Sequence, residues 1–110
     1  MASSAILTAR VRDALLRQPG IAEKRMFGGT TFMLDGNMLV AIWNDCLIAR
    51  IGIEQATTAL KKRHVVPMDV TGRPMKGWVI VTSEGVDEDR DLQNWIDQAL
   101  LFVRTLEPKK

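Results

Sequence analysis

The sequence predicts one α+β domain with two layers, in which helices pack mainly on one face of an antiparallel sheet. Three observations support this fold class. Apolar residues recur at helical spacing near both ends of the chain, the middle is rich in strand-forming residues, and tight-turn sequences divide that middle. With 110 residues, 46% of them apolar and 25% charged, the chain has the size and composition of a single globular domain, residues 1–110. The expected element order is α-β-β-β-α-β-β-α.

The first element is a helix predicted over residues 4–18. Ser3 and Ser4 are suited to cap its N-terminus, because a serine hydroxyl accepts a hydrogen bond from a free amide of the first turn. The apolar residues that follow recur at helical spacing until Pro19-Gly20 ends the pattern.

Three strands that form an antiparallel meander come next. They are predicted over Arg25–Leu34, Met38–Trp43 and Cys46–Ile51, and the turn sequences Asp35-Gly36-Asn37 and Asn44-Asp45 separate them. The second strand is apolar at consecutive positions, and therefore on both faces of the sheet. We expect the second face to be covered by a loop or a helix end, or else to meet another subunit in a homodimer.

A short helix and an edge strand follow the meander. The helix has an apolar stripe made by Ile53, Ala56 and Leu60. The strand is predicted over Val65–Val70, at an edge of the sheet because Pro67 has no amide hydrogen to donate to a neighbour.

The last two elements are a strand over Gly77–Thr82 and a helix with an apolar stripe over Leu92–Leu106. The acidic segment Asp87-Glu88-Asp89 precedes the stripe, where negative charge stabilises a helix N-terminus. Trp78 and Trp95 lie on the apolar positions of these elements, and we expect both to be buried in the core.

Composition and charge exclude several classes of protein. The single cysteine, Cys46, rules out an intrachain disulfide, no signal peptide is recognisable, and no apolar run reaches the roughly 18 residues that span a bilayer. We therefore expect a cytoplasmic protein that does not enter a membrane. Residues 47–83 are mainly basic and residues 84–97 mainly acidic, which predicts a surface with two oppositely charged sides.

The sequence predicts no catalytic residue, metal site or cofactor. His64 is the only histidine, and it stands beside a basic run without further ligands at matched spacing. A nucleophilic cysteine needs a nearby base, and the chain has no second histidine that could serve Cys46 in this way. A structural thiol is therefore the favoured interpretation of Cys46.

Two glycine-containing segments stand out. The first includes Met26, Phe27, Gly28 and Gly29 and leads into a strand, which favours a bulge or close packing over a phosphate cradle. The second includes Gly72, Pro74 and Gly77 and is interpreted as a connection between strands. The cations in and beside these segments, Arg25, Arg73 and Lys76, are candidates for contact with an anion or a partner.

Both glycine-containing segments resemble motifs of a known family of protein domains. Arg25-Met26-Phe27-Gly28-Gly29, followed by Phe32 and Gly36-Asn37, is similar to the opening of the N-terminal domain of the TfoX/Sxy competence-regulator family. Pro67-Met68-Asp69 and Gly72-Arg73-Pro74-Met75-Lys76-Gly77 resemble its later signature. The resemblance implies a two-layer α+β fold of the secretion-chaperone-like kind, here as a stand-alone domain without the family's C-terminal domain. Full-length regulators of the family assist transcription of competence genes alongside the cyclic-AMP receptor protein.

Two functions from different classes are therefore expected. The favoured one is a non-enzymatic regulatory or protein-interaction domain, linked to transcription or competence, with a protein partner and without specific DNA binding of its own. The alternative is a small-molecule or anion-binding domain that uses Arg25, Arg73 and Lys76. Convergence of the three cations in a pocket would favour the alternative, and separated cations beside an apolar patch would favour the first.

Overall fold

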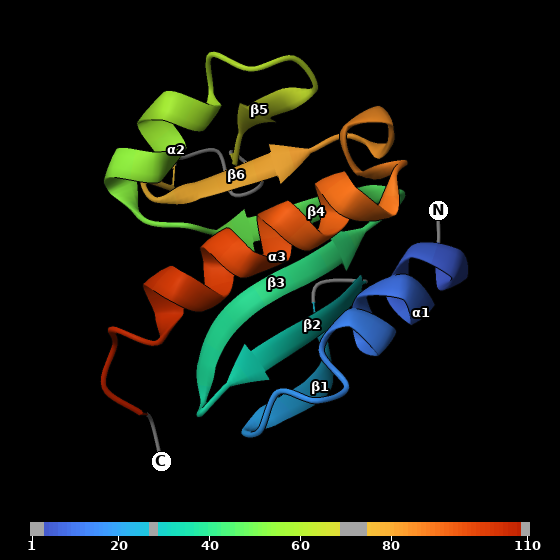
Figure 1. Ribbon diagram of the computed structural model, residues 1–110, viewed down its shortest axis with the longest axis vertical. Coiled ribbons are helices and arrows are strands. Elements are labelled where there is room, and N and C mark those ends of the chain that lie inside the picture. The colour runs from blue at the N-terminus through green and yellow to red at the C-terminus, as the bar shows by residue number, and fades with distance from the viewer. Residues whose placement is uncertain (1–3, 27–28, 69–74, 109–110) are drawn as a thin grey trace.

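The protein folds as a six-stranded antiparallel sheet with helices on one face (Figure 1). The computed structural model describes residues 4–26, 29–68 and 75–108. The sheet order is β1-β2-β3-β4-β6-β5. In chain order the elements are α1 (Ala5–Ala14), β1 (Ile21–Met26), β2 (Gly29–Leu34), β3 (Asn37–Trp43), β4 (Cys46–Arg50), α2 (Ile53–Ala59), β5 (Val65–Pro67), β6 (Trp78–Val81), the 3-10 turn η1 (Ser83–Val86) and α3 (Asp89–Val103).

The predicted fold class and order of elements are confirmed, with one addition. The segment predicted as a single strand over Arg25–Leu34 contributes to two strands, β1 and β2. These strands pair in antiparallel register from Ile21 opposite Leu34 to Met26 opposite Gly29. The extra strand, β1, contains Glu23, Lys24 and Arg25, so the hydrophobic pattern that reveals a buried strand is missing from it.

The main core lies between the sheet and the helices. α1 contributes Leu7 and Val11, and Ser4 caps this helix by accepting a hydrogen bond from the Leu7 amide at 3.0 Å. α3 packs on this core through its predicted apolar stripe, and its buried residues are Leu92, Trp95, Ile96, Ala99, Leu100 and Val103. Trp95 is 6% exposed and Trp78 is 9% exposed, which confirms that both are buried, and Ile42 of β3 is fully buried as well.

The second face of the sheet carries a smaller apolar cluster. Ala41, Ile48, Trp78 and Ile80 form this cluster, and side chains at its rim are half-buried. The described rim residues are Met38, Cys46, Met68 and Met75. The prediction that the central strand is apolar on both faces is therefore confirmed.

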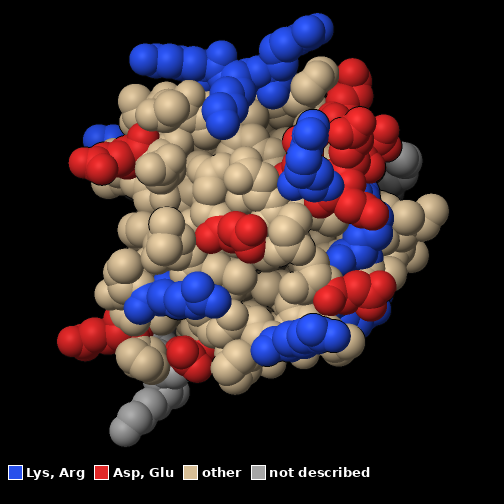
Figure 2. Space-filling view, in the orientation of Figure 1, with Lys and Arg blue, Asp and Glu red and all other residues tan. Residues whose placement is uncertain are grey.

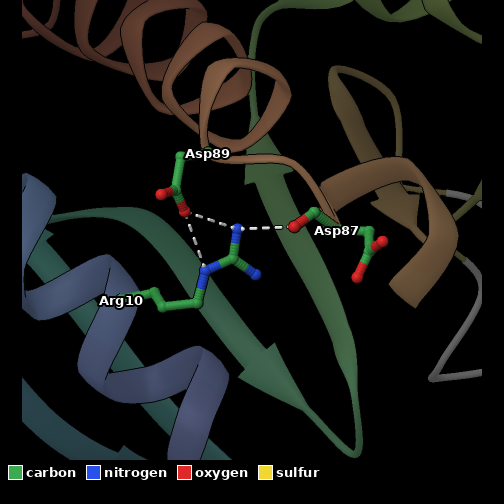
Figure 3. Close-up of polar contacts among 3 residues, drawn as sticks. All are labelled: Arg10, Asp87 and Asp89. Carbon is green, nitrogen blue, oxygen red and sulfur yellow. Dashed lines mark hydrogen bonds and ion pairs between the residues drawn. The ribbon is translucent and has the colours of Figure 1, made fainter.

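A polar clamp joins α1 to the start of α3 (Figure 3). Arg10 donates to Asp89 Oδ1 from Nη2 at 3.0 Å and from Nε at 3.2 Å, and Nη2 also donates to the backbone carbonyl of Asp87 at 3.1 Å. Asp89 lies in the first turn of α3, where its charge also favours the helix N-terminus, as predicted for this acidic segment. The clamp fixes the two helices that cover the sheet against each other.

Candidate protein-interaction surface

Two glycines with left-handed backbones fix the start of α2. Gly52 has φ +90° and Gly77 has φ +87°, a region that residues with a Cβ atom rarely adopt. The Gly77 carbonyl accepts hydrogen bonds from the amides of Ile51 at 3.0 Å and Gly52 at 3.1 Å. A Cβ atom on Gly52 would lie 2.7 Å from Cδ1 of Phe102, so α3 packs directly on this backbone. The end of β4, the approach to β6 and the second half of α3 therefore meet where α2 begins.

α2 packs on the core through its small residues and exposes its large ones. Ala56 and Ala59 are buried, whereas Ile53 is 61% exposed and Leu60 is 40% exposed. The predicted apolar stripe of Ile53, Ala56 and Leu60 lies on this helix, but only Ala56 of the three is buried. The small alanines allow close approach to the sheet, and this approach turns the flanking large side chains outward.

α3 adds a third large apolar side chain to this region. Leu101 is 71% exposed although its neighbour Leu100 is only 7% exposed. The run from Ala99 to Val103 is apolar at five consecutive positions, and a helix cannot direct five consecutive side chains to one core. That run is the sequence signal by which the exposed position could have been found.

Two grooves flank the Ile53 side chain. The first, of about 410 Å³, separates Ile53 from Leu101 and Phe102 of α3. The second, of about 340 Å³, lies between Ile53 and Leu60 on one side and Pro67, Met75 and Trp78 on the other. We call the two grooves and these apolar residues the α2 surface.

The charge around the α2 surface is uneven. Lys76 is the charged residue among those that line the second groove, and Lys61, Lys62 and Arg63 follow directly after Leu60. Glu54 lines the first groove. Figure 2 shows mainly uncharged side chains over α2, an acidic side chain over the middle of α3, and basic side chains gathered beyond the end of α2. The second groove is therefore an apolar channel next to positive charge.

The basic and acidic regions adjoin, contrary to the two-sided surface that the sequence predicts. His64 Nδ1 lies 4.0 Å from Glu84 Oε2. The residue that follows the basic run therefore lies next to Glu84, the first residue of the mainly acidic stretch 84–97. Lys62 directs its Nζ over the Trp95 ring, 5.6 Å from the centroid. In Figure 2 the two kinds of charge gather at the same end of the molecule. The turn before β5 and the turn before α3 lie side by side there, which the spacing along the chain does not reveal.

The candidate cations do not all come together. Arg25 lies on β1 and Lys76 just before β6, and the order of the sheet puts four strand spacings, about 19 Å, between these strands. The pairing aligns Arg25 through Thr30, Ile42 and Leu47 with Val81, at the far end of β6 from Lys76. Arg73 lies outside the described residues. Arg25 and Lys76 thus occupy different corners of the sheet.

The glycine-rich motif residues have distinct positions. Gly29 begins β2, where an added Cβ atom would collide with the backbone carbonyl oxygen of Ile42 on β3. The register irregularity in β2 lies further on, between Phe32 and Met33. Met26 ends β1, and Gly77 holds the turn before β6. The other motif residues, Phe27, Gly28, Gly72 and Pro74, lie outside the described residues.

The remaining reactive groups lie apart from one another. Burial and the neighbouring Asp45 carboxylate raise the pKa of the Cys46 thiol, which disfavours the nucleophilic thiolate. Within residues 4–26, 29–68 and 75–108, no three His, Cys, Asp or Glu side chains are grouped so that they could hold a metal ion. None of the helices in this part of the chain has the length and apolar character needed to cross a bilayer.

The protein is therefore a small α+β domain with the apolar α2 surface at one end of its sheet. The model of the TfoX N-terminal domain family matches residues 13–103, which is most of the chain. The chain belongs to this family, and the predicted resemblance to it is confirmed. No curated protein and no solved structure matches the chain significantly.

Proposed function

We propose that this protein is a non-enzymatic regulatory domain that binds a protein partner at the α2 surface. The observation that carries the proposal is the exposure of Ile53 and Leu101 on either side of a groove. Large apolar side chains that line a groove on a folded domain mark interaction sites more often than isolated exposed ones do. Ile6 and Leu16 on the α1 side are as exposed, but they line neither of the two grooves of the α2 surface.

The partner that fits this surface is an apolar segment flanked by carboxylates. Its apolar side chains would enter the grooves on both sides of Ile53. Its carboxylates would lie near Lys76 and the basic run after Leu60, because opposite charges favour this orientation over the reverse. Any role in transcription or competence would then depend on this protein contact and not on reading DNA.

The position of the cations also supports this function over the anion-binding alternative. A site for a small anion requires several donors within hydrogen-bonding reach of one group. Arg25 lies on β1 and Lys76 just before β6, and the sheet order keeps these two strands far apart. Lys76 adjoins an apolar groove, where it supplies one charge to orient a peptide.

Selection from a displayed random-peptide library tests the proposal. We expect enriched peptides to carry apolar residues beside Asp or Glu, and to lose binding to Ile53→Gln and Leu101→Gln. Leu16→Gln is the matched control, because Leu16 is 76% exposed and lies outside both grooves. Lys76→Glu should shift the selected peptides away from acidic residues. Peptides that bind all three glutamine variants equally would contradict the proposed site.

A further inference from the structure

The two edges of the sheet differ in their capacity to accept another strand. β5 has three residues and ends in Pro67, which cannot donate a backbone hydrogen bond. β1 has six residues in unbroken register with β2, and Ala22, Glu23, Lys24 and Arg25 are exposed. Among the described residues, the backbone of β1 is hydrogen-bonded to β2 alone, so its outer edge is open.

We infer that the outer edge of β1 binds β1 of a second copy of this chain in antiparallel register. This pairing forms a symmetric dimer with one continuous twelve-stranded sheet. The inference concerns a different surface from the α2 surface and does not depend on it. The argument rests on the open edge and on the charges that each register would bring together.

The faces of β1 follow from its pairing with β2. Glu23 lies opposite Phe32, a residue of the main core, so Glu23 and Arg25 are on the helix face. Arg12 of α1 confirms this side, because its Nε and Nη2 each donate to Glu23 at 2.8 Å. Ala22 and Lys24 are therefore on the second face.

Symmetry limits the registers that the two strands can adopt. A two-fold axis perpendicular to the sheet keeps both sets of helices on one side, and residues directly opposite each other then share a face. Centring the axis on Glu23 would oppose two Glu23 carboxylates without any compensating pair. Centring it on Lys24 opposes Glu23 of each copy to the partner subunit's Arg25, and this register has two complementary pairs.

The favourable register carries one unfavourable contact. The two Lys24 side chains meet across the axis on the second face, and like charges directly opposite each other destabilise a strand pair. Lysine has a long flexible side chain and its ammonium group is exposed, so the two groups separate into solvent. Glu23 keeps free lone pairs while it is bound to Arg12, because each carboxylate oxygen accepts more than one hydrogen bond.

Analytical ultracentrifugation of the full chain at low salt tests this inference. We expect a dimer that dissociates on dilution and with added salt, because the deciding charge pairs are exposed. Arg25→Glu should reduce association at least tenfold, because it places a second carboxylate opposite Glu23 in both pairs. The double variant Glu23→Arg with Arg25→Glu should restore the dimer.

The controls separate a specific register from a general effect of charge. Arg63→Glu makes the same change in net charge at an exposed position of the basic run, and it should leave association unchanged. Circular dichroism confirms that each variant is folded before association is compared. A chain that stays monomeric over the accessible concentrations, or equal loss of dimer in Arg63→Glu and Arg25→Glu, would overturn the inference. A folded double variant that remains monomeric would overturn the proposed register.

Discussion

Two adjacent leucines in α3 provide a sharp test of how this domain is built. Leu100 is 7% exposed and Leu101 is 71% exposed, and both lie in the last turns of the same helix. The substitutions Leu100→Ala and Leu101→Ala are chemically identical and have similar effects on helix propensity. Any difference between them therefore measures tertiary packing.

The expected magnitudes follow from burial. Leu100→Ala removes side-chain carbons from the main core and leaves a cavity, which costs about 2–5 kcal/mol in comparable sites. Leu101→Ala removes mostly solvated surface, and alanine is at least as favourable as leucine in a helix, so the expected change is within about 0.5 kcal/mol. For a domain of this size, the first change lowers Tm by roughly 8 °C or more.

Urea and thermal unfolding of both variants, followed by circular dichroism, measure this difference. The same Leu101→Ala variant should weaken peptide binding at the α2 surface while it keeps the wild-type melting temperature. Equal loss of stability in the two variants would refute the assignment of Leu101 to the surface. If a stable Leu101→Ala variant bound peptide as tightly as the wild type, the exposed Leu101 side chain would have no part in peptide binding.

Three further predictions concern the core, the glycine motif and the charges. Trp95→Ala should lower the free energy of unfolding by about 3–5 kcal/mol in urea titrations, because Trp95 is buried where α3 packs on the core, and an unchanged midpoint would contradict its place in the core. Gly29→Val should cost about 1–3 kcal/mol in thermal melts, because a side chain there meets the Ile42 carbonyl, whereas a ligand cradle would leave stability intact. Binding to duplex DNA should be weak, indifferent to sequence and lost at moderate salt, and a sequence-selective complex against random competitor would disprove this.

Much of the fold could be predicted because its elements have strong local signals. The helix α3 has a clear apolar stripe, and the turns around Gly36 and Asn44 have the residues that left-handed backbones favour; their φ angles are +86° and +55°. Pro67 correctly indicated an edge strand. In each of these cases the residue's own chemistry restricts the backbone.

The elements that escaped prediction are determined by distant contacts. β1 has charged residues on both faces, and its strand geometry depends on pairing with β2. The position of α2 depends on Gly52 meeting Phe102, two residues fifty positions apart in the chain. The exposure of Ile53 follows from that packing, so the outward position of its side chain could not be derived from the local apolar pattern.

The two proposed surfaces lie at opposite ends of the strand order, and this placement has a consequence for assembly. A dimer through β1 would leave both α2 surfaces free, because these adjoin β5 and β6 at the other ends of the combined sheet. Nine strand spacings would separate the two copies of β6, which is roughly 40 Å along the sheet. One short peptide could not span both sites, whereas a partner with two such segments, or a partner that is itself a dimer, could bind both. The gain in affinity from such double binding depends on the spacing of the segments and requires no additional contact.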